Sequence, residues 1–194
     1  MKGKIYVLVG KSGSGKDTVY RAVQGELGLL PIVSTTTRPM RPSEREGVEY
    51  YFISDEKFKE MEDKDEFIET RYYNTIQNGK EAVWCYGISK GAIDLDKGDH
   101  IVIVDLNGLE ELIAVYGDSV VAIYVHVDDE ERERRAILRG GYEEAEWNRR
   151  LEDDNIQFNY ERINKNVNFI VHNIELGATV LTVKNIIENV SLLG

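Results

Sequence analysis

Short apolar runs alternate with longer amphipathic stretches along most of this 194-residue sequence. The uncharged runs have the length of buried strands and cover residues 5–9, 30–33, 101–104, 120–127 and 167–171. Helical periodicity marks residues 17–27, 55–63, 89–96, 109–116, 129–138, 143–164 and 178–190. This alternation predicts an α/β fold with a mostly parallel, five-stranded sheet.

Residues 35–88 interrupt the alternation. They contain a proline-rich stretch, the aromatic run 50–52, and Asn78-Gly79 between two strand-like runs, which is a strong hairpin signal. We therefore expect a β-rich insertion at 35–88 within a core made of residues 1–34 and 89–194. A densely charged segment follows residue 128, and its run 130–135 is typical of a solvated helix face with many ion pairs.

The first apolar run leads directly into a glycine-rich loop. Glycines allow several backbone N–H groups to point at one anion, and the following helix adds its positive end. A lysine at the end of the loop supplies a full charge for β- and γ-phosphates. The sequence therefore predicts a loop that binds the phosphates of ATP (the P-loop), formed by Gly10, Ser12, Gly13, Ser14, Gly15, Lys16, Asp17 and Thr18.

One position departs from the phosphate-loop motif. The motif has Ser or Thr after the lysine, and that hydroxyl usually holds Mg²⁺, but this sequence has Asp17. Either the carboxylate of Asp17 holds the ion, directly or through water, or Thr18 replaces the missing hydroxyl. Asp17 would alternatively be an ordinary first-turn acid, stabilised by the helix dipole.

Charge and composition narrow the classes of protein. The formal net charge of −11 disfavours general binding to nucleic acids, which are polyanions. A single cysteine, Cys85, excludes an internal disulfide framework and a cysteine-based zinc site. The sequence lacks both a membrane-spanning apolar run and the layout of a secretory signal. We therefore expect a cytoplasmic protein without membrane contact, either a monomer or a homodimer.

Two arginines mark a second candidate phosphate site. Arg38 and Arg41 lie three residues apart in a stretch that prolines keep from forming a regular helix. Two converging guanidinium groups suit the phosphate of a nucleoside monophosphate, because each planar fork makes bidentate contacts. On spacing alone, two surface arginines in a turn are the favoured explanation of the pattern.

The order of motifs resembles the guanylate kinase family over nearly the whole chain. The likeness rests on the P-loop, on the stretches 34–41, 47–52, 67–69, 86–87, 104–108 and 170–173, and on the spacing of the arginines that follow residue 134. It implies a P-loop NTPase three-layer fold, with 35–88 as the nucleoside monophosphate (NMP)-binding domain and a helical lid at about 129–150. Together these parts would form one compact kinase unit.

The resemblance also implies roles for individual residues. Arg38, Arg41, Tyr50 and Tyr86 would hold the acceptor phosphate, while Ser34 and Glu69 would contact guanine. A carboxylate suits guanine because it accepts hydrogen bonds from N1–H and the exocyclic amine, whereas N1 of adenine carries no proton. Asp105 would orient the acceptor or a Mg²⁺-bound water. The transferring phosphoryl group would be surrounded by the catalytic cations Lys16, Arg38, Arg135, Arg139 and Arg150.

Two further departures fall near the acceptor base. Ile88 stands where the family has Ser or Thr, a hydroxyl that helps to read O6 of guanine, and Ser89 is the adjacent candidate. Ile103 stands where the family has a second aspartate. The leading hypothesis is ATP-dependent, Mg²⁺-assisted phosphorylation of GMP or dGMP. The alternatives are a sugar-phosphate kinase similar to ribose 1,5-bisphosphate phosphokinases, which carry Asp after the lysine, and a silent guanylate-kinase-like binding module, a class that tends to lose the lysine.

Overall fold

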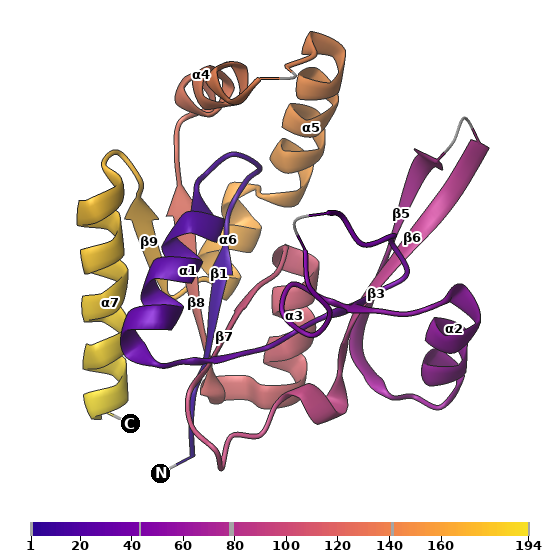
Figure 1. Cartoon of the computed structure of the whole chain (residues 1–194). Helices are drawn as coiled ribbons and strands as arrows, with labels where there is room; N and C mark the ends of the chain where they lie inside the picture. Colours follow the sequence, from indigo (N-terminus) through magenta and orange to yellow (C-terminus); the bar gives the residue numbers. More distant parts are fainter. Residues whose placement is uncertain (1, 43, 78–79, 141, 194) are drawn as a thin grey trace. The chain divides into compact units, whose positions relative to one another are not determined.

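The computed structural model describes residues 2–42, 44–77, 80–140 and 142–193 (Figure 1). The chain divides into two compact units, which we call unit 1 (residues 1–30 and 95–194) and unit 2 (residues 31–94). None of the helices in the described ranges combines the length and apolarity that a membrane crossing requires.

A five-stranded sheet forms the centre of unit 1. Its order is β2-β7-β1-β8-β9, and the pairs β1/β7, β1/β8 and β8/β9 are parallel, which confirms the predicted sheet. Every residue of β1 is buried, as expected for a central parallel strand covered on both faces. The strands are β1 (Ile5–Val9), β2 (Leu30–Pro31), β7 (His100–Ile103), β8 (Val120–His126) and β9 (Phe169–His172).

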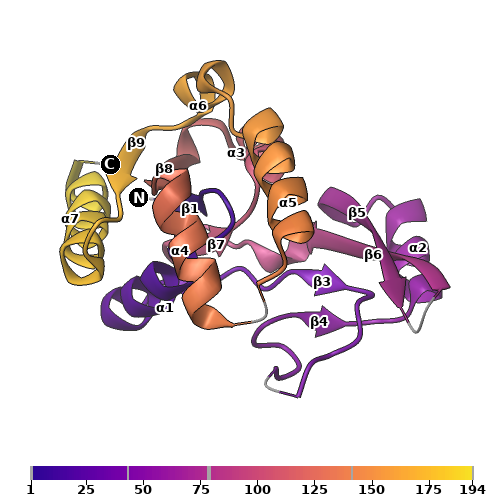
Figure 2. The ribbon, with the colours of Figure 1, turned by 90° about the horizontal axis from the view of Figure 1, so that it is seen from above.

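Helices cover both faces of this sheet, giving three layers (Figure 2). Helices α1 (Lys16–Leu27) and α7 (Leu176–Leu193) pack together on one face, where Tyr6 and Leu8 of β1 meet Val19 of α1 and Val183 of α7. Helices α3 (Leu106–Tyr116) and α6 (Tyr160–Asn166) lie on the other face, with the short turn η2 (Gly117–Ser119) after α3.

The charged segment after β8 forms two helices, α4 (Asp129–Arg139) and α5 (Glu144–Gln157). The single helix expected over 143–164 is wrong, because the chain breaks between α5 and α6. Phe158 ends α5 and is buried against Tyr124, with ring centroids 5.8 Å apart. Asn159 then starts α6 by accepting a hydrogen bond from Arg162 N at 3.0 Å. A side-chain cap of this kind favours a new helix start over continuation.

Unit 2 has its own four-stranded sheet in the order β4-β3-β6-β5. The strands are β3 (Thr35–Thr36), β4 (Tyr51–Phe52), β5 (Phe67–Gln77) and β6 (Lys80–Ser89), and helix α2 (Asp55–Asp63) precedes β5. Gln77 pairs with Lys80, which confirms the predicted hairpin, although its turn residues Asn78 and Gly79 lie outside the described residues.

The helix expected over 89–96 is also wrong. The β5–β6 ladder continues to Ser89, which pairs with Phe67, and Lys90 N then donates to Glu66 O at 2.8 Å. Only the single turn η1 (Lys90–Ala92) follows. Ser89, the expected first residue of that helix, is instead held in extended conformation by the ladder.

Candidate active site

The loop between β1 and α1 depends on glycine at two points. Gly15 caps α1 with φ +83°, in the left-handed region, and a Cβ there would lie 2.6 Å from Nδ2 of Asn173. A Cβ on Gly10 would lie 2.6 Å from the carbonyl oxygen of Val125. Both positions therefore exclude a side chain, and the chain reaches the start of α1 in the tight curve that an anion-binding loop requires.

Asn173, directly after β9, supports this loop from one side. Its Nδ2 donates to Ser14 O at 2.7 Å, and its Oδ1 accepts from the hydroxyl of Thr179 at 3.0 Å. Arg135 of α4 donates to the backbone oxygen of Asn173 at 2.9 Å. Sequence reasoning used Asn173 only as part of a family motif and missed this role. Its signal was its position at the carboxyl end of a parallel strand, where such sheets place functional residues.

Lys16 begins α1 and is partly buried. Burial lowers the pKa of Lys16 from its ordinary value, and the nearby carboxylates of Asp17 and Asp154 oppose that change. Asp17 and Thr18 follow in the first turn, and both are exposed. In the described part of the chain, no three His, Cys, Asp or Glu side chains are grouped so as to hold a metal ion.

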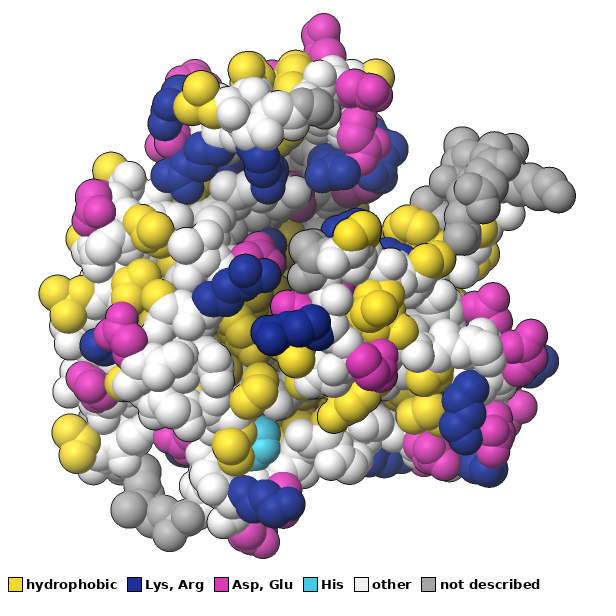
Figure 3. All heavy atoms as spheres, viewed as in Figure 1, with side chains coloured by type: hydrophobic (Ala, Val, Ile, Leu, Met, Phe, Trp, Pro, Cys, Tyr) yellow, Lys and Arg dark blue, Asp and Glu magenta, His cyan; other side chains and the backbone are white. Residues whose placement is uncertain are grey.

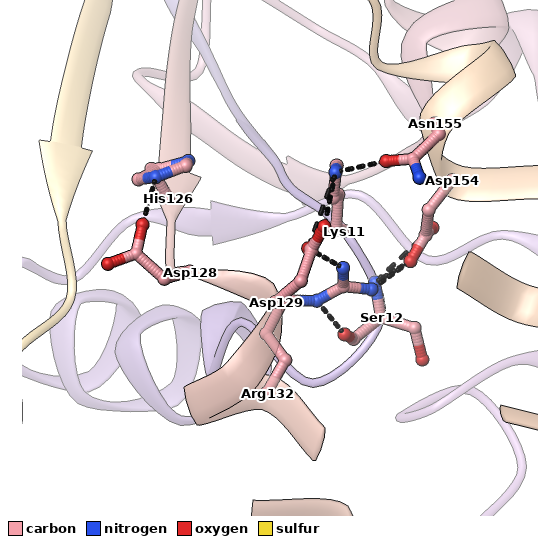
Figure 4. Close-up of polar contacts among 8 residues, drawn as sticks. All are labelled: Lys11, Ser12, His126, Asp128, Asp129, Arg132, Asp154 and Asn155. Atoms are coloured by element: carbon pink, nitrogen blue, oxygen red, sulfur yellow. Dashed lines mark hydrogen bonds and ion pairs between the residues drawn. The ribbon is translucent and has the colours of Figure 1, made fainter. Parts of the chain in front are cut away.

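Arg132 of α4 is fully buried and also contacts the loop (Figure 4). Its Nε donates to Ser12 O at 2.7 Å, and its other nitrogens pair with Asp129 and Asp154. The guanidinium carbon lies 5.3 Å from the ring centre of Trp147 on α5. The expectation of a solvated helix face over 130–135 is therefore wrong for Arg132, because helix periodicity turns this residue inward, towards the P-loop.

Asp154 of α5 completes this arrangement. One of its oxygens accepts a hydrogen bond from Ser12 N at 3.1 Å, so both backbone polar groups of Ser12 are bound by the helices after β8 (Figure 4). Burial raises the pKa of Asp154, and the neighbouring charge of Arg132 opposes the rise. Lys11 adds a further link by donating to Asn155 Oδ1 at 2.6 Å. The helices α4 and α5 are thus attached to the P-loop through several side chains.

The three arginines predicted for the transferring phosphoryl group have different environments. Arg135 is half-buried, pairs with Glu131 at 2.8 Å and lies beside Gly15 of the P-loop. Arg139 and Arg150 are exposed, and Arg150 pairs with Glu146 at 2.6 Å. Figure 3 shows Lys and Arg side chains beside Asp and Glu over α4 and α5.

Asp105 lies at the carboxyl end of β7. Its carboxylate accepts from Gly108 N at 2.9 Å and caps helix α3. This capping bond uses one of the two carboxylate oxygens. The predicted contact with the acceptor or with a Mg²⁺-bound water therefore stays a prediction.

In unit 2, Arg38 is buried rather than displayed on a surface turn. Its Nη2 pairs with Glu44 at 2.7 Å, and its guanidinium carbon lies 5.5 Å from the ring centre of Tyr50. The hydrogen bond from Arg38 lowers the pKa of Glu44. Arg41 is exposed, and its backbone N–H donates to the same Glu44 at 2.8 Å. Sequence reasoning missed Glu44, whose only signal was an acid shortly after two arginines.

Aromatic rings surround this arginine. The rings of Tyr50 and Tyr86 meet edge to face with centroids 5.7 Å apart, and Tyr73 meets Tyr86 at 5.4 Å. Burial raises the pKa of Tyr50, so its hydroxyl remains protonated at neutral pH and is available as a donor. Unit 2 therefore brings Arg38, Tyr50 and Tyr86 together.

The residues predicted to read guanine lie on β5 and β6 and just before β3. Glu69 is buried, and Ile88 stands opposite it in the ladder and is fully buried. Ser89 follows Ile88 in the strand and therefore faces the other side of the sheet. Ser34 is buried, and its backbone oxygen accepts from Tyr51 N at 2.9 Å.

A parallel sheet whose first strand leads through a glycine-rich loop and a lysine into the first helix defines a P-loop NTPase fold. The sequence comparison is more specific, because the model of the family described as guanylate kinase matches residues 2–190. The chain therefore belongs to the guanylate kinase family, whose members are phosphotransferases.

Individual relatives agree with this assignment. The chain is 31% identical to the guanylate kinase of Clostridioides difficile, over 97% of this chain and 88% of that protein. It is 33% identical to the guanylate kinase of Chlamydia muridarum, over 83% of this chain and 80% of that protein. The fold matches the crystal structure of guanylate kinase from Anaplasma phagocytophilum with a TM-score of 0.70 and 24% identity, covering 97% of this chain and 86% of that chain.

Proposed function

We propose that this protein transfers the γ-phosphoryl group of ATP to GMP or dGMP, releasing ADP and GDP or dGDP. Membership of the guanylate kinase family supports the reaction. The choice of acceptor rests on one observation about unit 2. This unit contains both a buried arginine next to tyrosine rings and a buried carboxylate. Arg38 and Tyr50 fit the acceptor phosphate, and Glu69 fits the two adjacent donors of guanine.

The donor side of the reaction belongs to unit 1. The loop N–H groups and Lys16 would bind the β- and γ-phosphates of ATP, and Arg135 lies next to Gly15 of that loop. In the transfer, an oxygen of the acceptor phosphate forms a bond to the γ-phosphorus while the bond to the β,γ-bridging oxygen breaks. Fixed cations stabilise the charge on the transferring group, which is the main contribution a protein makes to this chemistry.

A Mg²⁺ ion fits the start of α1. Asp17 and Thr18 offer an exposed carboxylate and hydroxyl immediately after Lys16, and this ion is usually bound by one or two protein oxygens together with substrate phosphates. When bound, Mg²⁺ would neutralise charge on the β- and γ-oxygens.

Under this proposal, separate segments of the chain would bind the acceptor and cover the donor. Residues 35–88 would bind the nucleoside monophosphate, and residues 129–150 would act as a lid over the donor, within a core formed by the rest of the chain. The hydrogen bond from Arg132 to Ser12 supports the lid assignment, because it joins α4 directly to the P-loop, and Trp147 of α5 packs against the same guanidinium. Closing such a site excludes water and so prevents hydrolysis of ATP.

An acceptor panel tests the proposal. A coupled assay with ATP and Mg²⁺ would compare GMP, dGMP, AMP, CMP and UMP, with ribose 1,5-bisphosphate included because of Asp17. We expect turnover of GMP or dGMP above all others. Failure to phosphorylate either guanine nucleotide would exclude the proposed reaction, and turnover of the sugar phosphate alone would establish the alternative.

The same assay tests the role of Lys16. We expect Lys16→Ala to lower kcat by about 10³-fold or more, because it removes the ammonium charge that we assign to the β- and γ-phosphates. Lys184→Ala is the matched control, since Lys184 forms an ion pair with Glu26 on the helical surface of the same unit. Equal activity of the two variants would contradict the role of Lys16.

A further inference from the structure

Two oppositely charged side chains lie next to each other on one face of the unit 2 sheet. Glu69 and Arg71 are two residues apart on β5, and alternate residues of a strand point to the same face. Their cross-strand partners on β6 are Ile88 and Tyr86. Tyr86 in turn contacts Tyr50 beside Arg38, so Arg71 belongs to the same face as the proposed acceptor site.

The two side chains form a fork-shaped ion pair. Arg71 Nε lies 2.8 Å from one oxygen of Glu69, and Arg71 Nη2 lies 3.1 Å from the other. The Glu69 side chain is only 1% exposed and that of Arg71 17% exposed. A carboxylate this deeply buried requires compensation, and Arg71 provides one hydrogen bond, from Nη2, together with its positive charge beside the other oxygen.

A guanine base offers the complementary pattern of hydrogen-bonding groups. Its Watson–Crick edge carries two donors, the exocyclic amine and N1–H, followed by one acceptor, O6. Glu69 can accept from both donors, but a carboxylate has nothing to offer O6. Ile88, which stands opposite Glu69, also has no hydrogen-bonding side chain. Arg71 provides N–H donors directly beside the carboxylate, where a base bound to Glu69 would present O6.

We propose that Arg71 is a specificity-determining residue that donates a hydrogen bond to O6 of the acceptor guanine while Glu69 accepts from N1–H and the amine. This inference rests on the proposed function, because it requires guanine to lie against Glu69. When no base is bound, the two opposite charges compensate each other. In the complex the guanidinium slides along the carboxylate, so that each charged group still has a partner. Adenine does not match either side chain. It presents an acceptor, its unprotonated N1, to the acceptor Glu69 and a donor, its amine, to the donor Arg71.

The test compares GMP with 6-thio-GMP, in which a sulfur replaces O6. The thio analogue keeps both donors for Glu69 and weakens only the acceptor offered to Arg71, because sulfur is a weak acceptor. We expect the wild-type protein to prefer GMP by about 10- to 100-fold in kcat/KM, the range for a hydrogen bond to a charged group. In Arg71→Met we expect the ratio of the two kcat/KM values to fall towards one, because kcat/KM for GMP decreases. Arg71→Lys should restore part of the ratio.

Controls distinguish a direct hydrogen bond from Arg71 to O6 from an indirect role, in which Arg71 only holds the Glu69 carboxylate in place. If Arg71 only held the carboxylate in place, Arg71→Met would lower kcat/KM for GMP and for 6-thio-GMP by the same factor. That result would overturn the inference. A gain in GMP affinity would overturn it as well, since it would show that Arg71 competes with the base. Lys57→Met removes a charge from an exposed ion pair with Glu60 in the same unit, and it should leave kcat/KM unchanged for both nucleotides.

Calorimetric binding of GMP distinguishes failure of this inference from failure of the proposed reaction. Turnover of GMP with an unchanged ratio in Arg71→Met would refute only the role of Arg71. Absence of both binding and turnover in the wild-type protein would refute both. The wild-type ratio needs no variant, so a preference for GMP of less than about threefold contradicts the inference even if Arg71→Met does not fold.

Discussion

At the scale of single residues, each unit contains an arginine withdrawn from water. Arg38 is 4% exposed and Arg132 is 0% exposed, and each is paired with a carboxylate, Glu44 in unit 2 and Asp154 in unit 1. A buried guanidinium cannot lose its charge at physiological pH, so it is stable only with such a partner. Both arginines also contact an aromatic ring, which adds to their fixation.

The Arg38–Glu44 pair makes the stability of the protein depend on pH. We expect Glu44→Gln to lower the free energy of unfolding at pH 7 by about 2 kcal/mol, between the values for exposed and fully buried pairs, since 11% of the Glu44 side chain stays exposed. The folded-state pKa of Glu44 is lowered below its ordinary 4.5, so this contribution is complete above pH 4.5 and disappears as the pH falls through the folded-state pKa.

Urea unfolding of wild-type protein and Glu44→Gln at a series of pH values measures this difference. Glu60→Gln is the control, because Glu60 also forms ion pairs but lies on the exposed side of α2, and we expect almost no effect there. A difference that is constant from pH 7 to pH 3 would show that Glu44 acts through something other than its charge.

At the scale of secondary-structure elements, the attachment of α4 and α5 to the P-loop can be tested by replacing a charged pair with an apolar one. Arg132→Met leaves Asp154 buried without its partner and should cost about 3 kcal/mol of stability. Adding Asp154→Leu should restore most of that loss, since apolar replacements of buried pairs are often neutral. The KM for ATP should remain raised by about 10-fold or more, because neither apolar side chain holds Ser12.

Thermal unfolding and steady-state kinetics with ATP distinguish these two effects. Arg134→Met serves as the control, because Arg134 is exposed on the same helix and pairs with Glu131. If the double variant recovered both the wild-type stability and the wild-type KM for ATP, the Arg132–Asp154 pair would contribute to packing alone. It would then have no role in positioning the P-loop.

The boundary between α5 and α6 gives a second prediction at this scale. We expect Asn159→Ala to cost about 1 kcal/mol, because it removes the side chain that accepts from Arg162 N at the start of α6. Asn164→Ala, an exposed position within the same helix, should be neutral or slightly stabilising, since alanine is the better helix former. Urea unfolding measures both, and equal effects would show that Asn159 is not acting as a cap.

The elements that the sequence predicts well are those with a strong local signal. The strand 5–9, the helix 55–63 and the loop between Gly10 and Lys16 follow from apolar patterning and glycine spacing. The break at Asn159 was missed because helix periodicity continues across it. The end of β6 at Ser89 was missed because its pairing with Phe67 is a long-range contact.

The candidate site shows the same division. Lys16, Arg38 and Glu69 are recognisable from motifs, whereas Arg132 and Glu44 are recognisable only from their partners in space. Within a run of charges, one arginine looks like any other until the helix turns it towards Ser12. The role that we propose for Arg71 cannot be predicted from a motif for a related reason, because it depends on the ion pair with Glu69, two positions earlier on the same face of the strand.

At the scale of the whole molecule, the formal net charge of −11 contrasts with the anionic ligands that we propose for it. Small phosphates can be bound because a few cations are held at fixed places, but an extended polyanion would meet repulsion over most of the surface. We expect no retention on a heparin column and no binding of duplex DNA in fluorescence anisotropy at low ionic strength. Salt-sensitive binding to either would contradict this view of the surface.

Unit 2 is one continuous stretch of the chain, inserted between residues 30 and 95. The ends of unit 1 that flank it lie near each other, since Leu30 N donates to Asp99 O at 2.9 Å. A substitute segment would therefore have to span only a small gap. Under the proposed function, evolution or protein engineering could therefore exchange the phosphate acceptor by replacing one contiguous insertion, while unit 1 keeps its own sequence.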